Sequence, residues 1–126
     1  MLAVVALIGA VPVLGKFGGS EVEIDVKYSK FSVSEMKVER GTSVTFVINN
    51  EDPIDHEFIV GDDKVHSRHE SGTEKVHGGV PGEVSVPAMS VASTTFTFTE
   101  PGVFRFVCHL PGHRRYGMEG VVTVTG

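Results

Sequence analysis

The sequence predicts an all-β fold, a Greek-key β-sandwich, and three observations support this prediction. Six or more short segments, rich in β-branched and aromatic residues, are separated by turn residues. The chain has 126 residues, of which 40% are hydrophobic, so it is long enough for one domain with a core and too short for two. The helical signal is confined to an excursion between residues 61 and 82.

Strands are expected from residue 21 to the end of the chain. Polar and apolar residues alternate strictly over Glu21–Tyr28, as in a strand with one buried face. Turn residues at Arg40–Gly41 and at Glu100–Gly102 separate neighbouring strands. A strand is also expected at residues 31–38, although Ser34 and Met36 blur its alternation. Further strands are expected at residues 43–49, 56–60, 94–99, 103–108 and 120–125.

The excursion from Gly61 to Gly82 interrupts this pattern. Residues 62–70 can form one or two helical turns, with Asp62 or Asp63 as the N-cap. The remainder is rich in Gly, Ser, Thr and Pro and is expected to be a loop. We therefore interpret residues 61–82 as an insertion between strands and residues 21–126 as a single domain.

Residues 1–15 contain no charged side chain. This stretch resembles the remnant of an export signal or membrane anchor, although it is shorter than the ~20 residues that span a bilayer. Residues 16–20 then form a linker into the domain. We expect an extracytoplasmic protein that is either exported or tethered to a membrane at its N-terminus; the alternative is a buried N-terminal strand or helix of the domain.

Charge and cysteine content exclude two other possibilities. A formal net charge of -5 with no basic stripe argues against nucleic-acid binding. The single cysteine cannot form an internal disulfide. The chain is expected to be a monomer.

A candidate metal site is concentrated near the C-terminus. Cys108, His113 and Met118 follow one another at five-residue intervals, and His56 opens a strand-like segment upstream. Two imidazoles, a thiolate and a weak axial thioether form the ligand set of a type 1, or blue, copper centre. Cys108 is expected at a strand end, and Pro111–Gly112 forms the sharp turn that brings His113 back toward the sulfur.

The stretch Phe106-x-Cys-x-x-Pro-Gly-His-x-x-x-Gly-Met-x-Gly resembles the signature of the cupredoxins, the plastocyanin/azurin superfamily. The spacing Cys-x₄-His-x₄-Met is similar to that of rusticyanin-like members. The resemblance implies one copper ion per chain, cycling between Cu(I) and Cu(II). It also implies a backbone N–H hydrogen bond from Glu57 to the Cys108 thiolate.

Two functions fit this ligand set. The first is a one-electron carrier, rather than an enzyme, that passes electrons between redox protein partners. The alternative is a copper-handling protein that binds or delivers the ion for resistance or cofactor assembly, which the histidines of the excursion favour.

The remaining histidines raise a second question. His66 and His69 lie three residues apart and could bind another metal with His77 and Met89; the alternative is a solvated polar loop. His109 follows Cys108, but Val107 precedes it, so the His-Cys-His element of multicopper oxidases is incomplete. We expect His109 to be exposed on the face opposite Cys108.

Two arginines, Arg114 and Arg115, flank the ligand loop. They could face an acidic partner or an anionic site. Alternatively, they form a solvated loop tip.

Overall fold

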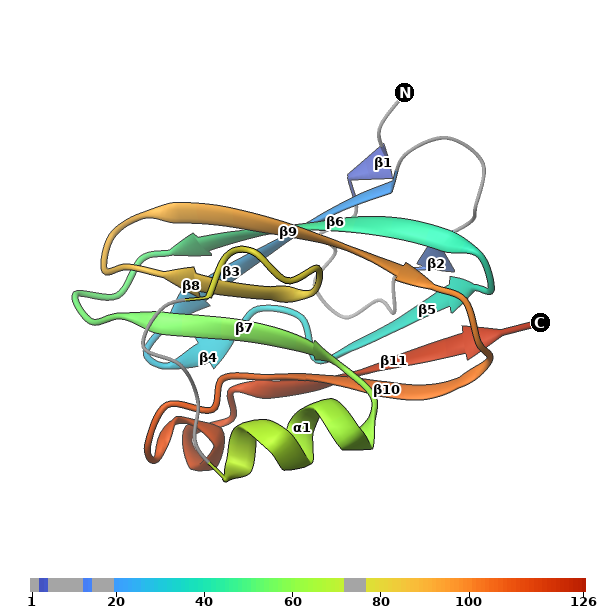
Figure 1. Cartoon of the computed structure of the whole chain (residues 1–126). Helices are drawn as coiled ribbons and strands as arrows, with labels where there is room; N and C mark the ends of the chain where they lie inside the picture. Colours follow the sequence, from blue (N-terminus) through green and yellow to red (C-terminus); the bar gives the residue numbers. More distant parts are fainter. Residues whose placement is uncertain (1–2, 5–12, 15–19, 72–76) are drawn as a thin grey trace.

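The computed structural model describes residues 3–4, 13–14, 20–71 and 77–126. Two β-sheets lie face to face (Figure 1). In spatial order, the first sheet contains β1 (Ala3–Val4), β3 (Ser20–Lys27), β6 (Thr42–Asn50) and β9 (Val91–Phe98), with β4 (Lys30–Phe31) paired to β3. The second contains β2 (Val13–Leu14), β5 (Glu35–Glu39), β11 (Glu119–Thr125), β10 (Gly102–Val107), β7 (His56–Gly61) and β8 (Glu83–Val86).

This arrangement confirms the predicted all-β sandwich. Neighbouring strands are often distant in sequence. For example, β11 pairs in parallel with β5, and β3 pairs in parallel with β6. The helical segments are α1 (Asp63–Glu70) and a 3-10 helix, η1 (His113–Tyr116). None of the helices in the described ranges is long and apolar enough to cross a membrane.

The single strand expected at residues 31–38 is divided in two. Phe31 pairs with Val26 in the first sheet, whereas Glu35 pairs with Val121 in the second. The chain therefore crosses between the sheets where the alternation of residues is blurred. The strand β8 was not predicted. It begins with Glu83, whose charged side chain is buried, whereas a charged residue in a sequence normally indicates an exposed position.

The predicted signal or anchor remnant, residues 1–15, and the linker, residues 16–20, lie mostly outside the described residues. In the described part, Ala3–Val4 pairs with β3 and Val13–Leu14 pairs with β5. Ser20 already begins β3.

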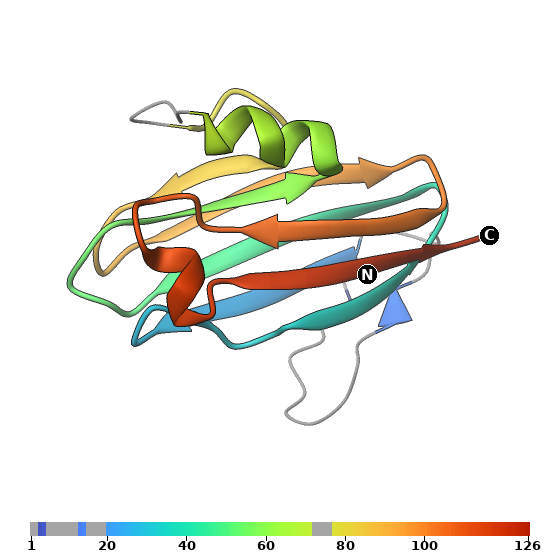
Figure 2. The same cartoon turned by 90° about the horizontal axis from the view of Figure 1, so that it is seen from below.

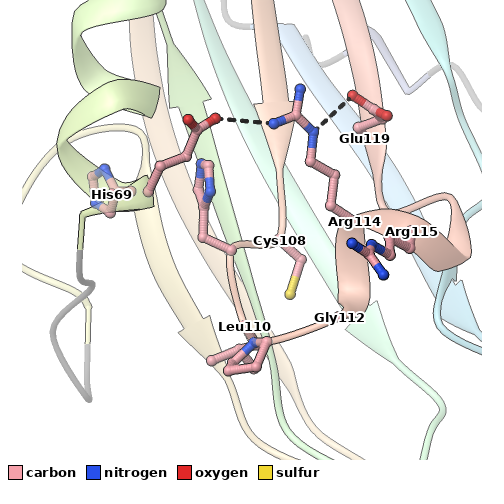
Figure 3. Close-up of a pocket in the computed structure, with 10 residues that line it drawn as sticks. His69, Cys108, Leu110, Gly112, Arg114, Arg115 and Glu119 are labelled. Carbon is pink, nitrogen blue, oxygen red and sulfur yellow. Dashed lines mark hydrogen bonds and ion pairs between the residues drawn. The ribbon is translucent and has the colours of Figure 1, made fainter.

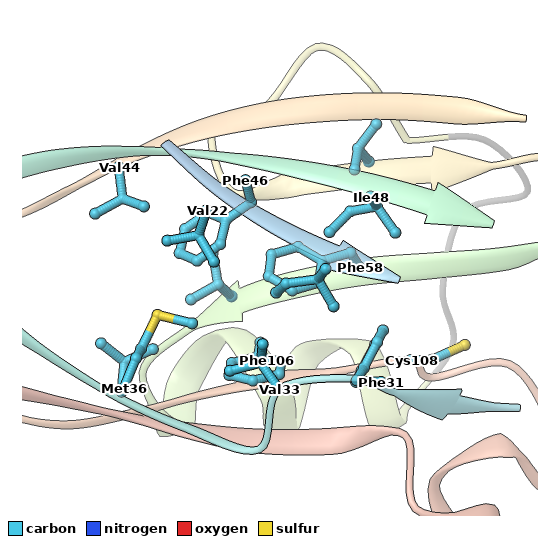
Figure 4. Close-up of a cluster of buried hydrophobic side chains, with 14 of the residues drawn as sticks. Val22, Phe31, Val33, Met36, Val44, Phe46, Ile48, Phe58, Phe106 and Cys108 are labelled. Atoms are coloured by element: carbon cyan, nitrogen blue, oxygen red, sulfur yellow. The ribbon is translucent and has the colours of Figure 1, made fainter. Parts of the chain in front are cut away.

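The core between the sheets is aromatic at its centre (Figure 4). Phe58 of β7 and Phe106 of β10 stack with ring centroids 5.4 Å apart, and Phe31 packs edge-on against both. Phe46 of β6 contacts Phe58 from the opposite sheet at 5.0 Å. These contacts fix the spacing of β7 and β10, the two strands that lead to the candidate metal site.

The helix α1 covers the outer face of the second sheet, against β7 and β10 (Figure 2). Of the two predicted N-cap candidates, Asp62 is the one used: its side-chain carboxylate accepts a hydrogen bond from Val65 N–H at 3.1 Å. Every residue of β7 is buried, because the core covers one face and α1 the other. Side chains on the outer face of the second sheet are therefore also buried where α1 covers β7.

Gly120 tests how tightly the aromatic core is packed. A Cβ at this position would overlap the ring of Phe106, which Phe31 and Phe58 hold in place. We expect Gly120→Ala to lower the free energy of unfolding of the metal-free protein by about 1–3 kcal/mol in urea denaturation. Gly79→Ala is the control, because no atom lies within 4 Å of its added Cβ. Equal stabilities of the two variants would contradict the packing argument.

Candidate metal centre

The alternation of side chains along β7 and β10 brings His56 and Cys108 to the same end of the core. His56 precedes Phe58 by two residues and Cys108 follows Phe106 by two, so both share the inward face of these phenylalanines. Both are buried, and Cys108 lies at the end of the core cluster in Figure 4. Two segments some fifty residues apart in sequence thereby meet at one point.

The loop after β10 returns to the same point through backbone hydrogen bonds. Cys108 N–H donates to Met118 O at 3.0 Å, and Met118 N–H donates to His113 O at 3.4 Å. Gly112 and Gly117 have φ values of 80° and 103°, a conformation that glycine adopts without strain. The three side chains predicted as ligands from this loop are thus held by a closed backbone frame.

The donor atoms of three predicted ligands converge. His56 Nδ1 lies 3.0 Å from His113 Nδ1, and Cys108 Sγ lies 3.5 Å from His113 Nδ1. Atoms that share one ion at about 2.0–2.3 Å must lie within about 4.6 Å of one another, and both distances satisfy this limit. The fourth predicted ligand, Met118, is fully buried and belongs to the same core cluster as Cys108.

Asp52, which no local sequence motif marks as part of the site, orients the His56 ring. His56 Nε2 donates to Asp52 Oδ2 at 2.7 Å, which leaves Nδ1 without a proton and directed at the other ligands. Backbone N–H groups of Tyr28 and Ser29 donate to the same carboxylate at 2.7 and 2.9 Å. Burial alone would raise the pKa of Asp52, but these hydrogen bonds and His56 outweigh it, so the pKa is lowered. The carboxylate therefore stays charged.

Asn50 fixes the loop that carries Asp52. Its side-chain oxygen accepts from Asp52 N–H at 2.9 Å, and its amide donates to the Ile54 and Val86 carbonyls at 2.9 and 3.0 Å. In the sequence, residues 49–53 are a cluster of turn-forming residues before His56, which indicates a loop there. The cluster does not indicate that Asn50 contacts Val86, because that residue is distant in sequence.

Burial sets the protonation of the Cys108 thiol. Loss of solvent raises the pKa of Cys108 to about 11, although backbone hydrogen bonds from Glu57 and Leu110 lower it in part. The Glu57 bond to sulfur is the one that the family resemblance implied. A thiol with this pKa is protonated at neutral pH unless a cation replaces the proton, and a coordinating thiol is deprotonated outright.

The pKa of His113 is lowered, first by burial and then by the neighbouring His56. This ring is therefore neutral at neutral pH, as a metal ligand must be. Together with Met118, the two imidazoles and the thiol form a soft and borderline donor set that matches copper better than magnesium or calcium. The residues present fit a copper ion.

His66, His69 and His77 are buried, which contradicts the alternative of a solvated polar loop. His66, His69 and His77 are 1%, 4% and 7% exposed, because α1 packs against the sheet. Met89 does not join them, since it is 70% exposed. Among the residues that the structure describes, His69 and His77 form a group of possible metal ligands with Glu83.

The expectation that His109 is exposed was also wrong. It is half-buried, with Nε2 2.9 Å from His66 Nδ1 and its ring stacked on that of His69. Burial, followed by the charges of His66 and His69, lowers the pKa of His109 to about 4. His109 does lie opposite Cys108, but α1 covers that face.

Arg114 connects the ligand loop to α1 (Figure 3). Its guanidinium donates to Glu70 Oε1 at 2.9 Å and to Glu119 Oε1 at 3.3 Å. The Arg114 side chain is therefore ion-paired within this chain while it remains partly exposed, and Arg115 is exposed.

Comparison with known proteins agrees with the geometry. The sequence model of the copper-binding proteins of the plastocyanin/azurin family matches residues 20–125. A copper-resistant cuproprotein CopI of Rubrivivax gelatinosus is 35% identical over 98 residues, which are 75% of this chain and 59% of that protein. A copper-resistant cuproprotein CopI of Pseudomonas aeruginosa is 28% identical over 135 residues, covering 82% of this chain and 75% of that protein.

Solved structures show the same fold. Auracyanin B superimposes with a TM-score of 0.67 at 22% identity, over 84% of this chain and 88% of its own. The reduced auracyanin of Roseiflexus castenholzii gives a TM-score of 0.66 at 21% identity, over 94% of this chain and all of its own.

The contact between Asp52 and His56 yields a test of the site. We expect Asp52→Asn to weaken copper affinity about 10- to 100-fold, because the amide no longer fixes the tautomer and orientation of the ring. Competition with a copper chelator measures this affinity. Glu51→Gln, the same loss of charge at the exposed neighbouring residue, is the control and should bind as the wild type does. If both variants bind equally, Asp52 does not support the site.

Proposed function

This chain belongs to the plastocyanin/azurin family of copper-binding proteins, and we propose that it carries single electrons through a copper ion held by His56, Cys108, His113 and Met118. Copper is the cofactor. The observation that carries the proposal is the convergence of two imidazole nitrogens and one buried sulfur at distances of 3.0 and 3.5 Å. When bound there, copper supplies a one-electron couple between Cu(I) and Cu(II).

The chain's own residues supply rigidity. The Cys108 and Met118 backbones are hydrogen-bonded to each other, and His56 is fixed by Asp52. Ligands locked by packing and by outer hydrogen bonds move little when the charge of the ion changes. Small movement favours fast electron transfer.

His113 offers a route for the electron. Its side chain is only half-buried, whereas His56, Cys108 and Met118 are buried. The adjoining residues Pro111 and Gly112 are exposed. We propose that redox protein partners dock at this end of the sandwich and exchange electrons through the His113 ring.

The same proposal includes an extracytoplasmic location and a monomeric carrier that is not itself an enzyme. The uncharged residues 1–15 support export or an N-terminal membrane tether. Coordination would also protect the single thiol, Cys108, from oxidation outside the cytoplasm.

Copper handling for resistance is a second candidate function. Its specific support is the similarity to two copper-resistant cuproproteins, although the first alignment spans only 59% of that protein's length. A handling protein must release copper to an acceptor, whereas a carrier must retain it in both oxidation states.

A redox titration with a chelator separates these functions. We expect the copper-loaded protein to show intense visible absorption that is lost on reduction and regained on reoxidation. The absorbance plotted against the applied potential should follow the Nernst equation for one electron. A Cu(I) chelator added to the reduced protein should remove little copper over many redox cycles. Rapid loss of copper on reduction would contradict the carrier role and support handling.

Replacement of Met118 tests the axial position. We expect Met118→Leu to keep copper bound and to raise the reduction potential, because a weak electron donor is lost. Voltammetry of the loaded protein measures the shift. Met36→Leu, at a core methionine that is 1% exposed, is the matched control and should leave the potential unchanged. A Met118→Leu variant with the wild-type potential would exclude Met118 as axial ligand.

A further inference from the structure

A second group of ligand-type side chains lies on the outer face of the second sheet, beneath α1. The group consists of His69 in α1, Glu83 in β8, and His77, which precedes β8 in the chain. Their exposed fractions are 4% for His69, 4% for Glu83 and 7% for His77. One ligand atom from each lies within 4.8 Å of the other two. We call these three residues the outer-face cluster.

Hydrogen bonds orient His69 as a metal ligand. Its Nδ1 donates to the Val65 carbonyl at 2.7 Å, which leaves a lone pair on Nε2. That Nε2 faces Glu83 Oε1 at 3.1 Å. A lone pair and a carboxylate oxygen repel each other unless a proton or a cation lies between them. Metal-bound histidines commonly donate their other ring N–H to a carbonyl, as His69 does.

His77 approaches the same carboxylate oxygen. Its Nδ1 lies 3.4 Å from Glu83 Oε1, while its Nε2 lies 3.2 Å from Glu57 Oε1. The other oxygen of Glu83 accepts from Arg68 at 2.7 Å. Each member of the cluster therefore has a second contact that orients it: His69 with the Val65 carbonyl, His77 with Glu57, and Glu83 with Arg68. These contacts pre-organise the three donor atoms toward one point.

The donor set defines the class of metal. Two imidazoles and one carboxylate suit Zn²⁺ and Cu²⁺, and the absence of further oxygen donors from this set disfavours Ca²⁺ and Mg²⁺. At a given site of nitrogen and oxygen donors, Cu²⁺ binds more tightly than Zn²⁺. No thiol belongs to the cluster, so the intense colour of copper–thiolate coordination is not expected here.

Two surface pockets lead toward the cluster. One is lined by His69 and His109 between α1 and the ligand loop (Figure 3), and another by Glu57 and His77. A metal ion can therefore reach the buried donors from solvent.

We propose that His69, His77 and Glu83 bind a second divalent transition-metal ion, Cu²⁺ in preference to Zn²⁺. This site is distinct from the copper centre of His56, Cys108, His113 and Met118, and its existence does not depend on electron transfer there. A chain with its copper centre filled then takes up one further equivalent of metal.

The first experiment uses the wild-type chain already loaded with one copper. Calorimetry with Zn²⁺ should show one further equivalent bound, and Cu²⁺ should displace it. Electron paramagnetic resonance of the two-copper protein should add a signal with wide hyperfine splitting and without new intense visible absorption. If the loaded chain binds neither ion, protons occupy the cluster and the proposal is overturned.

Variants locate the site. Glu83→Gln should lower the affinity for the second ion at least about tenfold while the first copper retains its visible absorption, which shows that the variant is folded. Glu70→Gln, at the exposed end of α1, is the matched control and should bind as the wild type does. His69→Gln and His66→Gln form a second pair, since His66 lies on the same helix but outside the cluster. Equal second-site affinities within both pairs would overturn the assignment.

Discussion

The structure depends on one geometric constraint: successive side chains of β7 and β10 point to opposite faces of their sheet. His56 and Cys108 point into the core, and their neighbours Glu57 and His109 lie on the outer face. The backbone that supplies one cluster therefore also supplies the surroundings of the other. Glu57 shows this directly, because its N–H bonds the Cys108 sulfur while its carboxylate accepts from His109 N–H at 3.1 Å.

Burial changes the pKa of ionisable side chains on both faces of the second sheet. In water, a cysteine thiol and an imidazole exchange protons readily, but burial raises the pKa of Cys108 and lowers that of His113. The core ends in a thiol and a neutral imidazole that a soft cation can bind. Asp52 keeps its charge because four hydrogen-bond and charge contacts compensate for its burial, and so it can orient His56.

The outer face follows the same rule with different donors. Buried charged groups are costly unless they are paired, and Glu83 is paired with Arg68 and lies beside His69 and His77. The helix α1 makes this possible, since its His66 and His69 turn toward the sheet rather than the solvent. Two polar side chains of α1, His66 and His69, are thus buried although most of the helix is exposed.

Local patterns determined much of this protein. The two-residue alternation predicted the strands, Asp62 predicted the start of α1, and the spacing of Cys108, His113 and Met118 predicted a shared loop, because each depends on residues close in sequence. Only the tertiary structure decided that Asp52 supports His56, that residues 31–38 cross between sheets, and that Glu83 meets His69 and His77. The Glu83 contacts arise when α1 and β8 pack against β7, and a polar sequence gives no sign of which surface it will cover.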